Sequence, residues 1–397
     1  MSEPLPPHLD PRGRHRGRHP GQSHAATTYA RPIGYTLGAL LSISLIVLSG
    51  YLWYTFREIN KHVHRLHVQA LDVAPAGQSG SPGKDIDGED QNILLVGNDD
   101  RSNLTPAEIK ELHVGISGGS MSTDTMMLVH VPADGSKATL ISLPRDTWVH
   151  VAGHGFNRLN SAYAYGYLDY ANSHKNASDD DKRAAGADLL TQTVSNLTGL
   201  TINHYVQVSL LGFYDISNAI GGVPVVLCHA VNDTTAANHA AGLTGGSGLK
   251  LPKGRSVIQG VQALQFVRQR HFLPGGDLDR VRRQQYFLAS AFRQVASIGI
   301  LFKLQDLGGA LERNVYLDPG LDLIDLAHQM ENLTADNISG KTIPTTPAVI
   351  DGADVLTINK PKVQQFIGRA IGTIAPNPHK HKNHDKKPKA IDSKCVN

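Results

Sequence analysis

The feature that most constrains this chain is an uninterrupted stretch without a charged side chain, from residue 33 to residue 56. Its 24 residues read IGYTLGALLSISLIVLSGYLWYTF. A helix needs about 20 apolar residues to cross a bilayer core of roughly 30 Å. Tyr51, Trp53 and Tyr54 stand near its C-terminal end, where amphipathic rings favour the membrane interface. Because both flanks are polar, the stretch predicts a transmembrane helix rather than a buried core helix.

A cleaved signal peptide is the main alternative, but its apolar core would span only about 7–15 residues and end in small side chains. We therefore interpret the stretch as an uncleaved signal anchor in the cell membrane. The residues before it favour a cytoplasmic N-terminus, since arginines outnumber the two acidic residues there: Arg12, Arg14, Arg16, Arg18 and Arg31 against Glu3 and Asp10. Everything after residue 56 is then expected outside the cell. The net charge of +3 over 397 residues gives no reason to expect a nucleic-acid partner.

Composition divides the chain into five segments. We expect a cytoplasmic basic arm over residues 1–32, the anchor over 33–56, a stalk over 57–90, a folded extracytoplasmic domain over 91–375 and a basic, disordered tail over 376–397. The spacing of Cys228 and Cys395 leaves open whether they pair.

Hydrophobic patterning in the folded segment alternates between strand and helix. Strands are expected over residues 92–97, 125–131, 137–143, 204–209 and 223–227, with helices over 187–197 and 211–220. Gly135 supplies the turn of a hairpin between the second and third strands, and Gly199 is placed to end the first helix. This succession predicts an α/β fold, with a mixed central sheet flanked by helices.

Polar residues stand at the ends of these strands, where ligands of open α/β sheets tend to bind. Asp99 and Arg101 follow the first strand, Asp124 opens the second, and Arg145 and Asp146 follow the third. Each of them alone is more often a turn residue or a surface ion pair.

A second polar cluster lies in FVRQRHFLPGGDLDRVRRQQ, residues 266–285. If residues 265–270 form a strand, Arg268 and Arg270 point to one face of it. Arg280 and Gln284 share one face of a helix that begins at Asp277 or Asp279, whereas Arg282 is expected in solvent. Guanidinium groups suit phosphate oxygens, and carboxylates together with substrate phosphates suit Mg²⁺, so the arrangement indicates a pyrophosphate ligand.

Over about residues 92–372 the chain resembles the LytR-CpsA-Psr (LCP) family of bacterial cell-envelope assembly. The resemblance is carried, in order, by the strings NILLVGNDDR, STDTMMLVHV, LISLPRDTWV, HYVQVSLLGFYDISNAIGGVPV, LPKGRSVIQGVQALQFVRQRH and DLDRVRRQQYFL. The single N-terminal anchor also fits the family.

The resemblance implies an LCP-like α/β/α fold and an enzyme that transfers a phospho-linked glycopolymer from a polyprenyl-pyrophosphate carrier to a sugar hydroxyl of peptidoglycan. It implies Mg²⁺ as cofactor, with Mn²⁺ as a substitute, held by Asp99 and Asp124. It assigns the pyrophosphate contacts to the positions Arg145, Arg268, Arg270, Arg280 and Gln284, and gives Arg101 a further binding role. The family also binds the prenyl tail in a long apolar pocket. The stretch between Asp99 and Asp124 is longer than is usual in the family.

Two other functions stay open at this point. The same site could hydrolyse the lipid pyrophosphate with water, or the protein could hold polyprenyl lipids without catalysis, as a regulator. The transferred polymer is equally open: teichoic acid, capsule, arabinogalactan or a glycoprotein glycan. Which group would deprotonate the acceptor also stays open, because an aspartate that binds Mg²⁺ is a poor base.

Overall fold

The computed structural model describes most of the chain after residue 62. The described residues are 42, 44, 46, 47, 50, 51, 63–72, 89–100, 105, 106, 109, 123–274, 276–297, 308–312, 315–330, 333, 337–374 and 395–396. The expected anchor and the expected residues 376–394 of the tail therefore lie largely or wholly outside them. Within the described ranges, no helix is both long enough and apolar enough to cross a membrane. The predicted anchor stays a prediction.

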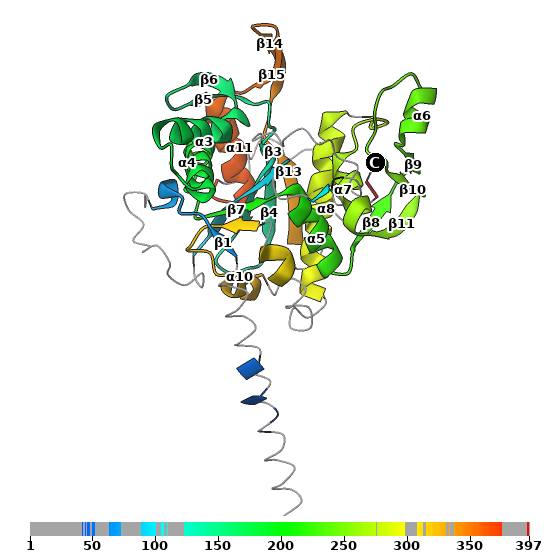
Figure 1. Cartoon of the computed structure of the whole chain (residues 1–397), viewed down its shortest axis with the longest axis horizontal. Coiled ribbons are helices and arrows are strands. Elements are labelled where there is room, and N and C mark those ends of the chain that lie inside the picture. Colours follow the sequence, from blue (N-terminus) through cyan, green and yellow to red (C-terminus); the bar gives the residue numbers. More distant parts are fainter. Residues whose placement is uncertain are drawn as a thin grey trace, which may run out of the picture. The chain divides into compact units, whose positions relative to one another are not determined.

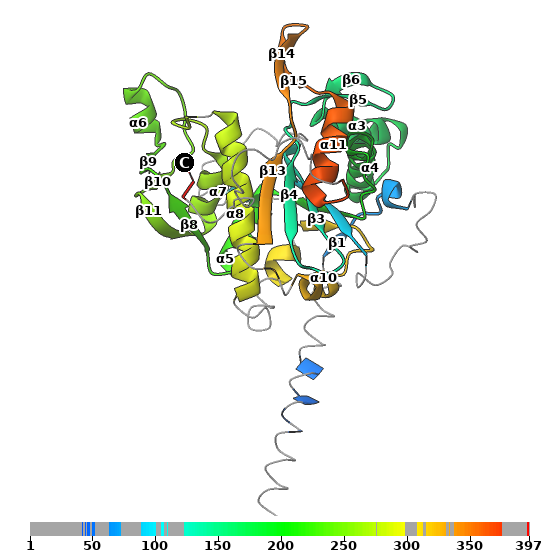
Figure 2. The same cartoon turned by 180° about the vertical axis from the view of Figure 1, so that it is seen from behind.

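A mixed sheet of seven strands forms the centre of the fold, in the order β1-β12-β7-β2-β3-β4-β13 (Figures 1 and 2). Pairing is parallel for β1 with β12, β7 with β2 and β4 with β13, and antiparallel for the other three pairs. The strands are β1 (His64–Arg65), β2 (Gln91–Asn98), β3 (Thr123–Val131), β4 (Ala138–Ser142), β7 (His204–Val208), β12 (Val315–Leu317) and β13 (Ile338–Thr342). This sheet confirms the predicted mixed α/β class.

Helices cover both faces of the sheet. One face carries α3 (Ser161–Ser173), α4 (Asp179–Thr198) and α11 (Lys360–Ile371); the other carries α5 (Leu210–Ala219), α7 (Gly260–Arg268) and α8 (Asp277–Ser297) (Figures 1 and 2). Alternation along β2 explains the two layers: Leu94 and Val96 belong to the core under α4 and α11, whereas Ile93 packs with Ala289 of α8. The β3–β4 turn and the end of α4 lie at glycines, as predicted. Gly135 (φ 58°) and Gly199 (φ 72°) both adopt the left-handed backbone conformation that such positions require.

Smaller elements surround these layers. Two-stranded sheets pair β5 (Trp148–Val151) with β6 (Gly155–Arg158), β8 (Val223–Leu227) with β11 (Gly254–Ile258), β9 (Val231–Asn232) with β10 (Lys250–Leu251), and β14 (Thr346–Ile350) with β15 (Ala353–Thr357). The remaining short helices are η2 (Gln69–Leu71), α6 (Thr235–Ala240) and α10 (Leu323–Gln329).

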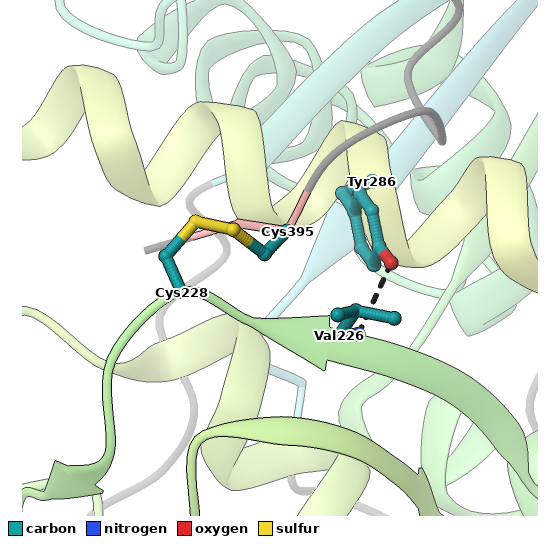
Figure 3. Close-up of a disulfide and its surroundings, with 4 residues drawn as sticks. All are labelled: Val226, Cys228, Tyr286 and Cys395. Atoms are coloured by element: carbon teal, nitrogen blue, oxygen red, sulfur yellow. Dashed lines mark hydrogen bonds between the residues drawn. A yellow bond between two sulfur atoms is a disulfide. The ribbon is translucent and has the colours of Figure 1, made fainter.

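The end of the chain is fastened to β8. Cys395 forms a disulfide with Cys228, directly after β8, and Tyr286 of α8 bonds to the same strand at Val226 (Figure 3). The Val226 N–H donates to Tyr286 Oη at 3.1 Å, and the Val226 carbonyl accepts from the Val396 N–H at 2.8 Å. The sequence left the pairing of the two cysteines open, and the structure pairs them. Val396 also forms a bridge with Leu227, and residues 376–394 of the expected tail lie outside the described residues.

Two expected assignments need correction. Residues 265–270 are not a strand, because α7 runs to Arg268; the buried positions Ala263, Leu264 and Phe266 lie on one helical face, which the alternating arginines obscured. The folded domain also begins before residue 91. Val63, Leu66 and Val68, placed in the expected stalk, are buried around β1, which pairs with the distant strand β12.

Candidate functional site

A cavity of about 510 Å³ opens between the sheet and the α5–α7–α8 layer. Six residues selected from the sequence line this one cavity, although they come from four separate segments: Asp99, Asp124, Arg268, Arg270, Arg280 and Gln284. Arg145 lies beside it, in a smaller hollow that it shares with Asp124, Arg280 and Gln284. Arg101 lies outside the described residues, so its role stays a prediction.

The two aspartates are placed by neighbouring strands. Asp99 follows the last residue of β2. Gly97 pairs with Thr125 and Asn98 with Thr123, so Asp124 is the extra residue of a bulge in β3. Bulges commonly redirect a side chain beside an active site. Here the bulged carboxylate accepts a hydrogen bond from Arg145 Nη1 at 2.6 Å.

The arginines approach from a turn and from two helices. Arg145 lies in the turn after β4, where Asp146 also holds it by an ion pair at 3.5 Å. Arg268 ends α7 and Arg270 follows in the next turn, so they are not neighbours on a strand as predicted. Arg280 is only 7% exposed, whereas Arg282 on the same helix has a side chain 68% exposed and pairs with Asp279. The expected exposure of Arg282 is confirmed, and Arg280 lies in the cavity wall, while its role in binding a ligand stays a prediction.

The wall formed by α8 changes from polar to apolar along its length. The cavity is lined in turn by Arg280, Gln284, Phe287, Leu288 and Ala291. At 1.5 Å per helical residue, this series covers about 16 Å. The apolar end is completed by side chains of β3, β7, α5 and α7, among them Met127, Val208, Leu210, Phe213, Ile216, Leu264 and Val267. The cavity lining therefore combines charged and polar side chains at one end of the α8 wall with apolar side chains at the other.

Buried polar pairs fix the surroundings of the site. Asp100, next to Asp99, forms an ion pair at 2.6 Å with Arg183 of α4, which lies almost wholly inside the protein. Burial opposes the charge of Arg183, but Asp100, Tyr316, Tyr163 and Asp179 together outweigh burial and raise its pKa above the ordinary value. On the opposite face, burial lowers the pKa of Arg283 to about 10. The guanidinium of Arg283 lies over the Phe266 ring at 5 Å or less and donates to Gln269, so it supports the fold rather than a ligand.

Sequence reasoning missed several polar residues of the cavity wall, among them Asn98, Asp233 and His271. Asn98 is 4% exposed, and neither its amide oxygen nor its amide nitrogen has a hydrogen-bond partner among the described residues. Asp233 and His271 line the cavity as a hydrogen-bonded pair, with 3.2 Å between Asp233 Oδ1 and His271 Nδ1. His271 stands within the quoted string RQRH, but nothing in that string indicated a partner 38 residues away.

The site offers hard oxygen ligands in a form that suits Mg²⁺. This ion commonly uses one or two protein carboxylates and completes its shell with water and substrate phosphate. Asp99 and Asp124 supply two carboxylates beside four arginines, which matches that requirement. No group of three or more His, Cys, Asp or Glu side chains converges within the described residues. The donor set thus fits a metal shared with a phosphate ligand rather than a closed protein site.

Comparison with known proteins gives a consistent result. The LytR_cpsA_psr family model matches residues 59–371. Cell wall biosynthesis protein LcpA of Corynebacterium glutamicum is 35% identical over 381 residues, which cover 90% of this chain and 69% of that protein. The Oceanobacillus iheyensis protein named polyisoprenyl-teichoic acid–peptidoglycan teichoic acid transferase TagU is 28% identical over 312 residues, 77% of this chain and 85% of that one.

Solved structures share the fold. Bacillus subtilis TagT has a TM-score of 0.51 at 21% identity, covering 75% of this chain and 95% of TagT. A structure described as TagT bound to LI-WTA has a TM-score of 0.52 at 22% identity with the same coverage. At such identities these structures establish the LCP-like architecture alone. Together with the family match over most of the chain and the curated relatives, they show that the chain belongs to the LytR-CpsA-Psr family and is an enzyme of the transferase class.

Proposed function

We propose that the enzyme transfers a phospho-linked glycopolymer from a polyprenyl-pyrophosphate carrier to a sugar hydroxyl of peptidoglycan. The observation that carries this proposal is the single cavity in which an arginine-rich, carboxylate-bearing wall continues into an apolar wall. A polyprenyl pyrophosphate has the same two parts. The name of the Oceanobacillus iheyensis relative, a polyisoprenyl-teichoic acid–peptidoglycan transferase, supports this reading.

In this proposal the guanidinium groups hold the pyrophosphate. Arg145, Arg268, Arg270 and Arg280 donate to its oxygens, and the amide of Gln284 adds a neutral donor. Phosphoryl transfer depends mainly on positioning and on stabilising charge, and preorganised guanidinium groups supply both. Because Arg280 is already buried beside the cavity, little reorganisation is needed when the ligand enters.

The acceptor hydroxyl then attacks the phosphorus that carries the glycopolymer. A new P–O bond joins the polymer phosphate to peptidoglycan, and the bond to the polyprenyl phosphate breaks. The leaving phosphate gains negative charge, which the arginines stabilise. Asp99 and Asp124 would hold Mg²⁺, which supplies further charge neutralisation when bound. Removing divalent metal with EDTA should abolish turnover, and adding Mg²⁺ or Mn²⁺ should restore it.

The membrane location belongs to the same proposal. The uncharged run of residues 33–56 and the arginines before it favour a single-pass anchor with the catalytic domain outside the cell. The disulfide adds independent support, because such bonds persist mainly in exported proteins. Tethering confines the enzyme to the bilayer that holds its substrate. A chain that starts at residue 57 should lose activity on vesicle-embedded substrate more than on a short, soluble analogue; equal losses would contradict a tethering role.

The four arginines proposed to hold the pyrophosphate form what we call the arginine clamp: Arg145, Arg268, Arg270 and Arg280. The substitution Arg268→Ala tests it, and Arg282→Ala, on the solvent side of α8, is the matched control. We expect Arg268→Ala to lower transfer by about 100-fold or more, since removal of one preorganised donor typically costs 10²–10³ in rate. Arg282→Ala should stay within a factor of two. Near-normal transfer by Arg268→Ala, at unchanged thermal stability, would contradict the clamp.

A further inference from the structure

We propose that His271 is the general base that deprotonates the acceptor hydroxyl, and that buried Asp233 positions it. This inference rests on the proposed transfer reaction, for which the two aspartates at the metal position are unsuitable bases. His271 lines the same cavity as Arg268 and Arg270, and its side chain is 29% exposed. Asp233 is 0% exposed.

Hydrogen-bond geometry determines which ring nitrogen carries the proton. The Asn238 amide nitrogen donates to Asp233 Oδ1 at 2.8 Å and to the Gly245 carbonyl at 2.6 Å, which uses both of its hydrogens. The amide cannot be flipped, because its oxygen would then face two acceptors. Asn238 therefore has no hydrogen left for His271 Nδ1, although the two nitrogens are 3.1 Å apart.

The proton shared by His271 Nδ1 and Asp233 Oδ1, 3.2 Å apart, must accordingly lie on the imidazole. The Nε2 atom of this tautomer carries a lone pair and can accept a proton. Since the Nδ1 edge faces the buried carboxylate, the Nε2 edge is directed away from it. This is the tautomer that a general base requires.

Hydrogen bonds to the Asp233 carboxylate favour its ionised form. Burial would raise the pKa of its carboxyl, but hydrogen bonds from Asn238, Ser247 and His271 together outweigh burial and lower it. The Ser247 backbone N–H donates to Oδ2 at 2.9 Å. Gly246 lets the loop wrap this closely: its φ is 151°, and a Cβ atom there would lie 2.4 Å from the Asn238 amide nitrogen. An ionised Asp233 would stabilise the imidazolium that forms when His271 takes a proton.

The backbone of His271 is held by a separate hydrogen bond. Its carbonyl accepts from Gln269 Nε2 at 2.8 Å, and Gln269 Oε1 accepts from buried Arg283 of α8. The next residue, Phe272, has a φ of 59°, a left-handed conformation that is uncommon for a large side chain. Such conformations persist where the surrounding structure imposes them, and they concentrate at functional sites.

The proposed step conserves atoms and charge. The acceptor O–H proton moves to His271 Nε2 as the oxygen forms its bond to the sugar-bearing phosphorus. The P–O bond to the polyprenyl phosphate breaks, and that phosphate leaves with the electron pair. The imidazolium then returns its proton to solvent or to the departing phosphate.

His271→Gln tests the base, because glutamine can keep a hydrogen bond to Asp233 but cannot accept the proton. The matched control is His154→Gln, since His154 forms a similar pair with Asp169, at 2.7 Å, outside the cavity. The probe is a synthetic polyprenyl-pyrophosphate-linked disaccharide with purified peptidoglycan, used with the full-length protein. We expect kcat to fall by about 100-fold or more in His271→Gln, as is typical for the loss of a general base.

The affinity for polyprenyl pyrophosphate should stay within threefold, and His154→Gln should match the wild type. Asp233→Asn should lower kcat in the same direction, and added imidazole should partly restore His271→Ala. A fall in kcat of less than tenfold, or a parallel loss of lipid affinity, overturns the assignment in favour of a structural role. If the wild type itself forms no peptidoglycan-linked product, the proposed transfer fails instead of the base.

Discussion

Asn98 and Asn92 stand on the same strand, yet their amides have opposite surroundings. Asn92 donates to the Thr201 carbonyl and meets His130 Nδ1, each at 2.9 Å. Asn98 lines the cavity with both polar atoms buried and without partners among the described residues. A buried, unsatisfied amide costs about 1–3 kcal/mol. A ligand that reaches this amide would recover that cost.

Replacement of each asparagine by leucine, which has a similar shape, should have opposite effects on stability at the two positions. Asn98→Leu should raise the free energy of unfolding by about 1–3 kcal/mol, because it removes an unsatisfied buried group. It should also weaken binding of polyprenyl pyrophosphate. Asn92→Leu should instead destabilise the protein, since it leaves His130 and Thr201 without their partner. Urea unfolding and a lipid-binding titration check both results, and a loss of stability in Asn98→Leu would contradict the assignment.

Individual site residues were predictable where residues close together in the sequence share one helical face. Arg280 and Gln284 are four apart in one helix, so their shared face follows from helical geometry. Asp233 and His271 were not predictable in this way. Their contact depends on a loop around Gly246 and on the turn after α7, which bring together residues 38 apart in the chain. Asn98 carries no signal at all, because its lack of partners exists only in the folded protein.

The helices α5, α7 and α8 are the elements that give the cavity its length. Ala291 marks the apolar end of the α8 wall, one turn beyond Phe287. A large side chain at this position would fill space that the account assigns to the hydrocarbon chain.

Ala291→Trp should therefore weaken binding of a long-chain polyprenyl pyrophosphate by at least about tenfold, which corresponds to about 1.4 kcal/mol. Binding of geranyl pyrophosphate, whose chain is short, should change little. Ala236→Trp, at an exposed position of α6 and outside the cavity, is the control for the substitution itself. Equal weakening for both ligand lengths would contradict an elongated hydrocarbon site.

Among the elements, those with a strong local period were the predictable ones. The hairpin of β3 and β4 and the helix α4 follow their patterns and their glycines. Residues 265–270 were misread because arginines at alternate positions fit a strand as well as a helix end. The strand β1 was missed because its pairing with β12 joins distant parts of the sequence, and its two residues are too few to show a period.

In the molecule as a whole, the disulfide links residue 228 to the last described segment, across a sequence separation of 167 residues. Val396 also packs against the cluster that contains Phe266 and Phe287, and Phe287 lines the cavity. The segment of residues 395–396 thus packs against the same cluster as Phe287, which lines the cavity.

Removal of the disulfide should destabilise the domain, because the bond restricts the unfolded chain. The double substitution Cys228→Ala/Cys395→Ala should lower the free energy of unfolding by about 2–5 kcal/mol. Reductant should lower the wild-type unfolding midpoint to a similar extent and leave the double variant unchanged. A wild-type midpoint that does not respond to reductant, although the thiols are shown to be free, would contradict this role.

The central claim is transfer to peptidoglycan, and the fate of the phosphorus tests it most directly. The full-length protein is incubated in detergent with Mg²⁺ and a polyprenyl-pyrophosphate-linked glycan radiolabelled at the sugar-bearing phosphorus, with and without purified peptidoglycan. We expect label in peptidoglycan as a phosphodiester, an equal amount of polyprenyl phosphate, and no turnover without the acceptor. Release of soluble glycan phosphate at the same rate with and without peptidoglycan would contradict it and identify a hydrolase.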